Sequence, residues 1–457
     1  MSNIPVAIIG GGISGLATAY DLQRQGKAFH LFESTNRLGG IIKTDSIKGF
    51  TIDGGPDSLL LQKPAAIELC KELGLEDQLI STLPPRTAYV VRNRKLYPLP
   101  SEAILGIPTS ISSLVTHRLI SPTGRFRMAL EILTTLKKTG TAQGDESIAH
   151  FFRRHFGQEC VDYIAEPLLA GIHAGSVDRL SMNSLFPRLV KAETDSGSIL
   201  AALRTRKERP SPKGIFRSLK GGIEVLTRTL SSRLPSENIH TGSSVTKIYG
   251  KKPYQLTLSN GTTLMADSVV LAVPAYVAAT ILQTLDSSLS HLCNEIPYTS
   301  TATVALGYPA ASITSPLIGT GFVVPRIEKE FALMAGSWVS SKWPNRSPDS
   351  SVLLRGFIGG VRNNSTLTEP DDRLIKIVQD DFSKLINISG QPVVSRVYHW
   401  RRLNPQHEVG HLERVQEIDR LLELHSGLYL IGAGVRGVGV PDCISHGRAV
   451  SSKITSK

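Results

Sequence analysis

The first sixty residues alternate between short apolar runs and a segment with helical spacing. Residues 6–9 are apolar and mostly β-branched, which predicts a buried strand. Over residues 14–25 apolar positions recur at the spacing of one helix face, and residues 28–32 form a second apolar run. Strand, helix and strand in this order predict the start of an α/β domain with a parallel sheet.

Further strand-like runs return much later in the chain. They cover residues 245–249, 254–258, 268–273 and 428–431, and a helix is predicted to begin near Asp442. A strand, glycine turn and helix at the C-terminal end could rejoin the edge of the first sheet. We therefore expect one discontinuous nucleotide-binding domain built from residues 1–60, 215–285 and 425–457.

Two insertions separate these pieces, and their patterns differ. Residues 100–213 are mostly helical in pattern, whereas residues 286–424 contain strand-like runs such as 301–309 and 350–360 separated by turns. We expect a helical domain over 100–213. We expect a substrate-binding domain with a mixed sheet over 61–99 and 286–424.

A glycine-rich turn links the first predicted strand to the first helix. The sequence Gly10-Gly11-Gly12-Ile13-Ser14-Gly15 satisfies G-x-G-x-x-G, in which the glycines permit a tight turn, close approach of a pyrophosphate and close helix packing. Glu33 follows the second strand at the separation where a carboxylate accepts hydrogen bonds from a ribose. The alternative is an ordinary turn with a solvated glutamate, but the strand–turn–helix context favours a dinucleotide site.

The net charge of the chain limits the kinds of binding partner that we expect. The chain has 457 residues, 51 basic against 39 acidic residues and a net charge of +12. This excess suits an anionic lipid surface or a substrate with carboxylates, although a solvated surface explains it as well. No nucleic-acid module appears, so we expect no nucleic-acid partner.

Cysteine spacing and hydropathy place further limits. The four cysteines form no C-x-x-C pair, so neither a disulfide framework nor a metal site is predicted. We find no export leader and no apolar run of the roughly 18 residues that span a bilayer. We expect a cytoplasmic protein.

One helical stretch mixes apolar and basic residues. Residues 125–138 carry Phe126, Met128, Leu130 and further apolar positions beside Arg125, Arg127, Lys137 and Lys138. Such a helix packs in a core or lies on an anionic membrane. The stretch by itself favours the core.

Several segments resemble one flavoprotein family. Arg37, the pairs Gly39-Gly40 and Gly54-Gly55, and Pro56-Asp57-Ser58 look like the N-terminal signature of the FAD superfamily of amine oxidases and porphyrinogen oxidases. Residues 166–187 ("EPLLAGIHAGSVDRLSMNSLFP"), 343–346 ("WPNR"), 353–360 ("LLRGFIGG") and 436–448 ("RGVGVPDCISHGR") narrow the resemblance. The chain is thereby identified as a member of the protoporphyrinogen/coproporphyrinogen oxidase family.

The resemblance implies an amine oxidase-like architecture with noncovalent FAD, a mixed-sheet substrate domain and a membrane-facing helical domain. It also implies oxidation of a porphyrinogen to a porphyrin in haem biosynthesis, with six electrons passed in three rounds to O2 to give H2O2. Because the flavin carries this chemistry, no catalytic residue is assigned to the protein. A peripheral position on the inner face of the cell membrane and handover of product to the next haem-pathway enzyme are further expectations.

The resemblance also implies site residues. The cofactor contacts are Gly10, Gly11, Gly12, Ile13, Ser14, Gly15, Glu33, Arg37, Gly39, Gly40, Gly55, Pro56, Asp57, Ser58, Val245, Trp400, Ala433, Val438, Gly439 and Val440. The substrate contacts are Gly171, Gly175, Trp338 and Arg86. Arg86 is assigned to a propionate because it stands two positions before Ala88, where the family places an arginine, and a strand repeats its face every two residues. Arg92 is the alternative.

Two other functions remain open at this point. A flavin-dependent amine oxidase shares the FAD signature, and the escort proteins of small GTPases use a related fold to bind prenylated partners. The sequence does not separate protoporphyrinogen IX from coproporphyrinogen III. We expect protoporphyrinogen, because most family members outside one bacterial group are assigned to it.

Overall fold

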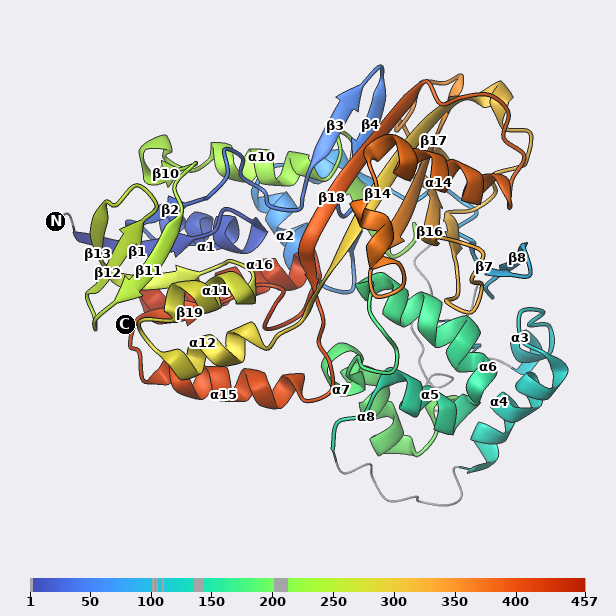
Figure 1. Cartoon of the computed structure of the whole chain (residues 1–457), viewed down its shortest axis with the longest axis horizontal. Helices are drawn as coiled ribbons and strands as arrows, with labels where there is room; N and C mark the ends of the chain where they lie inside the picture. The colour runs from blue at the N-terminus through green and yellow to red at the C-terminus, as the bar shows by residue number, and fades with distance from the viewer. Residues whose placement is uncertain are drawn as a thin grey trace.

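Figure 1 presents a computed structural model of the chain, which describes residues 3–100, 103, 106–108, 111–134, 144–200 and 213–456. The described chain folds into three parts that lie side by side. One sheet with helices on both faces holds the two chain termini, a second sheet lies beside it, and a group of helices lies beneath the second sheet (Figure 1).

The first sheet is assembled from distant parts of the chain. Its strand order is β10-β2-β1-β13-β12-β11. The seventh strand, β19, pairs with the carboxyl end of β13, whereas β12 pairs with the amino end. The strands are β1 (Asn3–Ile9), β2 (His30–Phe32), β10 (Ile239–His240), β11 (Val245–Tyr249), β12 (Tyr254–Leu258), β13 (Thr263–Leu271) and β19 (Leu428–Leu430). β1 is parallel to β2 and β13, and β19 is parallel to β13, so their carboxyl ends share one edge.

Both faces of this sheet are covered, which explains the continuous apolar run in β1. Val6 and Ile8 pack into one core with α1 (Ile13–Arg24), α2 (Ala65–Glu72), α10 (Glu224–Ser232) and α16 (Val440–Thr455). Ala7 and Ile9 pack into a second core with α11 (Ala275–Leu282), α12 (Ser287–Asn294) and α15 (His411–Glu423). A parallel strand buried on both faces needs apolar side chains at every position.

The second sheet is mixed, with order β18-β14-β17-β16-β15-β7-β8. The strands are β7 (Ala88–Arg92), β8 (Lys95–Pro98), β14 (Tyr298–Pro309), β15 (Gly321–Val323), β16 (Leu333–Trp338), β17 (Ser351–Gly359) and β18 (Val394–Pro405). Only β15 and β7 pair in parallel among these neighbours. α13 (Val339–Lys342) follows β16, and α14 (Asp371–Ser383) packs on the sheet through Leu374 and Val378.

Two small sheets connect the larger ones. β3 (Thr44–Ile47) and β4 (Phe50–Asp53) form a hairpin, and β9 (Phe216–Leu219) lies between β5 (Leu59–Leu60) and β6 (Leu79–Ser81). β3 to β6 lie on the path from the first sheet into the second, whereas β9 lies on the path from the helices back to the first sheet.

The third part consists of helices within residues 111–196. They are α3 (Ile111–Val115), α4 (Pro122–Thr134), α5 (Ile148–Phe156), α6 (Gln158–Cys160), the π-helix η2 (Val161–Ala170), the 3₁₀ turn η3 (Gly171–His173), α7 (Met182–Leu185) and α8 (Pro187–Ser196). Within the described residues, no helix combines the length and the apolar character needed to cross a bilayer.

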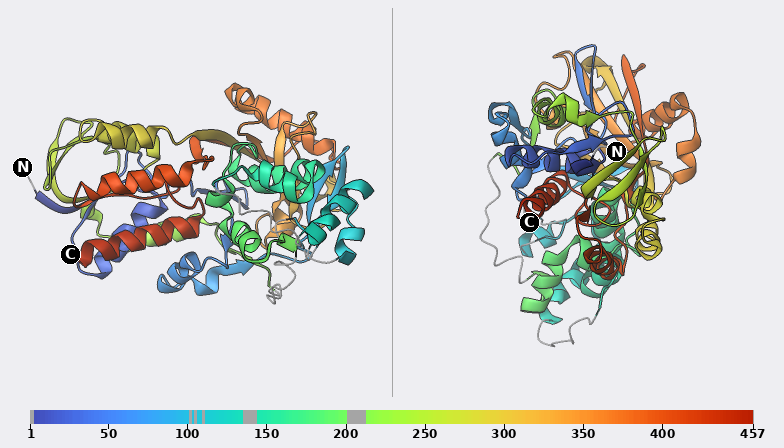
Figure 2. Two further views of the ribbon diagram at one scale, coloured as in Figure 1. Left: turned by 90° about the horizontal axis from the view of Figure 1, so that it is seen from below. Right: turned by 90° about the vertical axis from the view of Figure 1, so that its left-hand side faces the viewer.

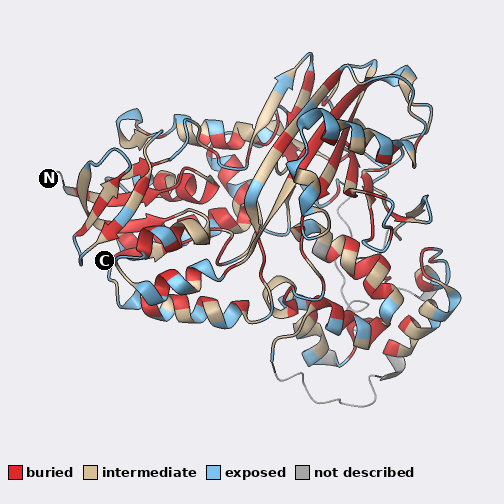
Figure 3. Cartoon of the chain, in the orientation of Figure 1, coloured by how far each residue is buried: buried red, intermediate tan, exposed pale blue. Residues whose placement is uncertain are grey.

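The sequence predicted most of these elements closely. The strand predicted over 254–258 matches β12. The strand predicted over 268–273 covers only the second half of β13, which begins at Thr263 and ends at Leu271, shortly before Pro274 and the start of α11. Figure 2 shows α16 alongside α1, and Figure 3 shows buried residues concentrated where helices meet the sheets. The exact domain boundaries stay a prediction.

Candidate cofactor and active site

The glycine turn brings the end of β1 to the start of α1. Gly10 has φ +108°, and a Cβ at Gly15 would lie 2.0 Å from the Gly10 carbonyl oxygen, so both positions require glycine. α1 then begins directly after Gly12, which has no side chain to cap the helix N–H groups. A helix N-terminus left in this state favours an anion.

Gly12 is the position that tests whether a pyrophosphate fits. Its backbone is extended, with φ −71°, and a Cβ built there meets no atom within 4 Å. Among the glycines of the described residues, Gly12 alone combines an ordinary φ with open space at the Cβ. The glycine is therefore not required by the protein's own packing, which is what a cradle for a ligand predicts.

Glu33 lies beside this turn and is already engaged by the backbone. Its Oε2 accepts a hydrogen bond from the Gly11 N–H at 2.7 Å, and its Oε1 accepts one from the Thr35 N–H at 2.8 Å. These bonds fix the carboxylate at the end of β2, next to the turn. This is the place where a ribose-binding carboxylate is expected.

The segment after Glu33 folds back onto the turn. The Gly39 N–H donates to the Gly11 carbonyl at 2.8 Å, and a Cβ at Gly40 would lie 3.3 Å from the Gly12 Cα. The Arg37 guanidinium donates to the carbonyls of Leu38, Gly40 and Ile42. Arg37 therefore holds this loop in shape.

Residues 54–58 form a second loop, referred to below as loop 54–58. The Trp400 indole on β18 donates from Nε1 to the Gly54 carbonyl at 3.0 Å and stacks on Tyr398 with ring centroids 6.4 Å apart. A Cβ at Gly55 would lie 2.0 Å from the Ile41 carbonyl oxygen, so this loop packs tightly against the preceding one. Pro56 and Ser58 complete the loop, and the Ser58 hydroxyl donates to Asp57 at 2.9 Å.

Asp57 is held by cations inside the protein. Its carboxylate contacts Lys342 Nζ at 2.9 Å and Arg355 Nη1 at 3.3 Å. Burial alone would raise the pKa of Asp57, but the two cations outweigh it and hold that pKa below its usual value. Asp57 is therefore ionised, and its carboxylate anchors the loop.

The C-terminal segment returns to the same place. Gly432 lies near the Ser14 hydroxyl, and Gly447 on α16 packs against the Ser14 carbonyl. The residues predicted to contact the flavin there, Ala433, Val438, Gly439 and Val440, lie between these points and are all partly exposed. Asp442 accepts a hydrogen bond from the Gly439 N–H at 3.2 Å, which orders the start of α16.

Two stacked histidines hold the backbone of the C-terminal segment. The rings of His407 and His411 lie 3.9 Å apart, and their Nε2 atoms contact the carbonyl oxygens of Ala433 at 2.9 Å and Val435 at 3.1 Å. Burial lowers the pKa of His411 to about 3 and lowers that of His407. Both rings are neutral at pH 7 and donate from Nε2.

Val245 lies at the start of β11, close to Glu33. The Ser243 N–H, two residues earlier, donates to the Glu33 carbonyl at 2.9 Å. The Val245 side chain is buried in the sheet core, so only its backbone could contact an adenine. The structure thus gathers the predicted cofactor residues around the carboxyl end of β1, where open α/β sheets bind nucleotides.

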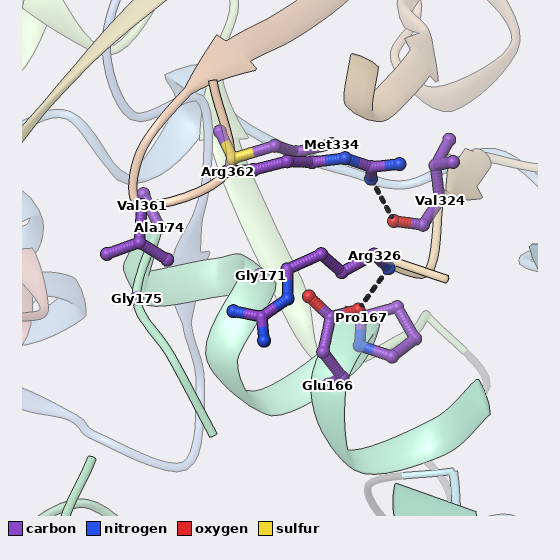
Figure 4. A pocket seen from close by; sticks show the side chains of 10 residues that line it. All are labelled: Glu166, Pro167, Gly171, Ala174, Gly175, Val324, Arg326, Met334, Val361 and Arg362. Carbon is purple, nitrogen blue, oxygen red and sulfur yellow. Dashed lines mark hydrogen bonds between the residues drawn. The ribbon is translucent and has the colours of Figure 1, made fainter. Parts of the chain in front are cut away.

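A pocket lies between the second sheet and the helical part of the chain. Figure 4 shows its lining by Glu166, Pro167, Gly171, Ala174, Gly175, Val324, Arg326, Met334, Val361 and Arg362. Ile172, between the two predicted glycines, leaves 72% of its surface exposed. Burial raises the pKa of Glu166, whose Oε2 accepts the Arg326 N–H at 2.7 Å.

Two predicted substrate residues are not brought to this pocket. Trp338 is 1% exposed, lies in the core of the second sheet and packs against Tyr89 and Phe322 at 5.5 and 6.2 Å between centroids. Arg86 precedes β7, which begins at Ala88, so the face alternation assumed for Arg86 does not apply. Its guanidinium donates to the Thr82 hydroxyl and carbonyl at 2.8 and 2.9 Å.

Arg92, the alternative to Arg86, is also engaged. It pairs with Glu159 at 2.7 Å and lies over the Tyr163 ring at 4.3 Å. Its role here is to join the second sheet to the helices.

Comparison with known proteins defines the class. The family model described as flavin containing amine oxidoreductase matches residues 13–455, and the chain belongs to that family. Within it, the chain is a porphyrinogen oxidase-type member. Coproporphyrinogen III oxidase of Bacillus subtilis (strain 168) is 38% identical over 98% of this chain and 97% of its own length.

Two further matches agree. Coproporphyrinogen III oxidase of Staphylococcus aureus (strain NCTC 8325 / PS 47) is 31% identical over 99% of both chains. A crystal structure from Exiguobacterium sp. 255-15, provisionally described as a protoporphyrinogen oxidase, has a TM-score of 0.88 and 29% identity, covering 100% of this chain and 99% of its own. The predicted family and its FAD cofactor are confirmed, and the cradle around Gly12 fits that cofactor.

Several residues at the site are not among those predicted from the sequence. Lys342, Arg346 and Arg355 lie behind loop 54–58, and Arg326 and Glu166 line the pocket. Arg355 interrupts the apolar run "LLRGFIGG". A charge inside a buried strand is rarely left unpaired, so it was a signal for an internal ion pair. Arg326 gave no comparable signal.

Proposed function

We propose that the protein oxidises coproporphyrinogen III to coproporphyrin III with FAD in haem biosynthesis, and that O2 accepts the electrons. The match to the Bacillus subtilis enzyme over nearly the whole of both chains carries this proposal. The names of the Bacillus subtilis and Staphylococcus aureus relatives favour coproporphyrinogen III over protoporphyrinogen IX, the substrate expected from the sequence.

The proposed chemistry removes six electrons and six protons from the macrocycle in three rounds. FAD, when bound, supplies the two-electron acceptor in each round, and O2 leaves as H2O2. The protein binds the cofactor and the macrocycle, orients them and excludes water.

The chain's residues divide this work between two sides. Gly10–Gly15 and the N-terminus of α1 would hold the pyrophosphate, and Glu33 would hold the ribose. Loop 54–58, with Trp400 behind it, would cover the flavin ring, and residues 438–440 would present the N-terminus of α16 to it. We assign the macrocycle to the Gly171–Gly175 turn, because both glycines line the pocket and Ile172 between them is exposed.

Arginines on the substrate side of the site would meet the substrate carboxylates. Coproporphyrinogen III has four propionates and protoporphyrinogen IX has two, so the first requires more cationic partners. Arg326 lines the pocket with 45% of its side chain exposed, and its guanidinium lies 3.8 Å from the carboxylate of Asp178. Arg86 remains a second proposed partner, provided that it leaves Thr82 when substrate binds.

An amine oxidase is the alternative, because the family takes its name from that activity. The experiment is to supply the flavin-loaded protein with coproporphyrinogen III, protoporphyrinogen IX or a panel of primary and secondary amines, and to measure porphyrin fluorescence and H2O2. H2O2 from an amine, with no porphyrin from either porphyrinogen, would establish the amine oxidase instead.

We also place the protein in the cytoplasm, peripherally attached to the inner face of the membrane. Two apolar side chains of the helical part support this, because Val115 on α3 and Phe126 on α4 are 63% and 66% exposed. Met128 on α4 is buried, so this helix both packs in a core and presents an apolar residue outward. Lys137 and Lys138 lie outside the described residues. Membrane attachment would favour handover of product to the next haem-pathway enzyme.

A further inference from the structure

Behind loop 54–58 lies a group of five charged side chains, here called the cation cluster: Asp53, Asp57, Lys342, Arg346 and Arg355. Lys342 and Arg355 contact Asp57, while Arg346 Nη2 lies 3.3 Å from Asp53 Oδ2. The residues come from the end of β4, loop 54–58, α13, the turn after it and β17. Three separate segments of the chain therefore meet at the loop.

The cluster is buried. The side chains of Arg346 and Arg355 are 0% and 1% exposed, and Lys342 is 17% exposed. In the described part of the chain, Nε and Nη1 of both arginines have no hydrogen-bond partner. Such guanidinium groups are costly to bury, so the cluster is not explained by stability alone.

Its contacts lead directly to the loop backbone. Arg355 Nη2 donates to the Gly55 carbonyl at 2.7 Å, and Lys342 Nζ contacts both oxygens of Asp57, at 3.0 and 2.9 Å. The Trp343 indole approaches Asp57 Oδ2 at 3.4 Å. The loop is thus held by cations at two points, Gly55 and Asp57.

The cluster carries more positive than negative charge. Three cations face two carboxylates, which leaves one positive charge. Glu224, which accepts the Thr44 N–H at 2.6 Å, is matched by Arg37 at 3.6 Å. Because water is largely excluded, this charge is screened less than one on the surface.

We propose that the cation cluster is an electrostatic support for the flavin, which fixes loop 54–58 over the ring and raises the reduction potential of the bound cofactor. Two-electron reduction of a flavin at neutral pH adds a negative charge to its ring. A fixed positive charge behind the loop stabilises that reduced form more than the oxidised one. Lys342 and Arg355 are positioning residues in this account. The inference depends on FAD and not on which substrate is oxidised.

Lys342 is the residue to change, because it is the cation of the cluster with some exposure and its loss leaves both arginines in place. Lys342→Met should shift the reduction equilibrium of bound FAD by about tenfold toward the oxidised form, equivalent to about 30 mV for a two-electron couple. Lys342→Arg keeps the charge and should stay close to the wild type. The potential is measured by dye-equilibrated reduction of the holoenzyme, without porphyrinogen, so this result is independent of the proposed substrate.

Two further variants separate charge from packing. Lys384→Met is the matched control, since Lys384 also pairs with a buried carboxylate, Asp381 at 2.6 Å, but contacts no residue of loop 54–58. The double variant Lys342→Met/Asp57→Asn restores the excess of one positive charge and should return the potential toward the wild type.

The outcomes are distinct. A lower potential in Lys342→Met, with Lys342→Arg and Lys384→Met unchanged, supports the proposal. Equal potentials in all variants overturn it, as does an equal fall in Lys384→Met. If Lys342→Met loses FAD, the potential is measured on Lys342→Gln, and a wild-type value there also overturns it.

Discussion

Replacing Gly12 by valine isolates the pyrophosphate site from the stability of the protein. The Cβ position meets no protein atom within 4 Å, and the φ of −71° is ordinary for valine. The flavin-free variant should therefore fold like the wild type. Any loss of FAD binding then reports on the ligand and not on the fold.

The magnitude follows from overpacking at a site that the ligand fills. Forcing extra methyl groups into a packed region costs about 1–3 kcal/mol. That cost should weaken FAD binding by roughly 5- to 150-fold, since each 1.4 kcal/mol is about tenfold. Gly12→Ala should lie at the lower end.

The assay is a titration of the flavin-free protein with FAD, followed by quenching of flavin fluorescence. The melting temperature of the flavin-free protein is measured beside it. Gly15→Ala is the contrasting control: its Cβ would lie 2.0 Å from the Gly10 carbonyl oxygen, so it should lower the melting temperature itself. Wild-type FAD affinity in Gly12→Val would refute the placement of the pyrophosphate.

Three further predictions concern the substrate, the membrane and pH. Arg326→Ala and Arg86→Ala should each raise KM for coproporphyrinogen III by roughly 10- to 150-fold if the lost contact is a desolvated charge-assisted hydrogen bond. The FAD content should stay unchanged. An unaltered KM removes that arginine from the site. The wild type should float with anionic liposomes at low salt and Phe126→Glu should not, whereas no flotation of the wild type in any salt rejects membrane attachment. Burial lowers the pKa of His411 to about 3, below the unfolded value of about 6.5, so the unfolded state binds more protons between these values and stability falls as pH falls. His411→Gln should make the denaturant-measured slope between about pH 4 and 6 shallower by up to about 1.4 kcal/mol per pH unit, and an unchanged slope contradicts the assignment.

Local signals allowed the cofactor half of the site to be predicted from the sequence. The turn at Gly10–Gly15 and the strand before it are specified within a few residues, because a buried parallel strand and a helix start have short-range patterns. Glu33 follows at a fixed separation along the same unit. The C-terminal segment was placed at the same sheet because it repeats the order of strand, turn and helix.

The substrate half could not be predicted in the same way. Trp338 was assigned to the macrocycle, yet a tryptophan on a buried strand packs equally well in a core, and here it does. The partners of Asp57 lie 285 and 298 residues away in the chain, so no local pattern connects them. Arg86 was placed by strand alternation, which fails because the strand begins only after it.

The most direct test is a side-by-side assay of the purified, FAD-loaded protein with coproporphyrinogen III and protoporphyrinogen IX in air. Porphyrin fluorescence and H2O2 are followed together. We predict faster formation of coproporphyrin III, with three H2O2 released for each porphyrin. No porphyrin above the rate of the protein-free control, from either substrate, would contradict it.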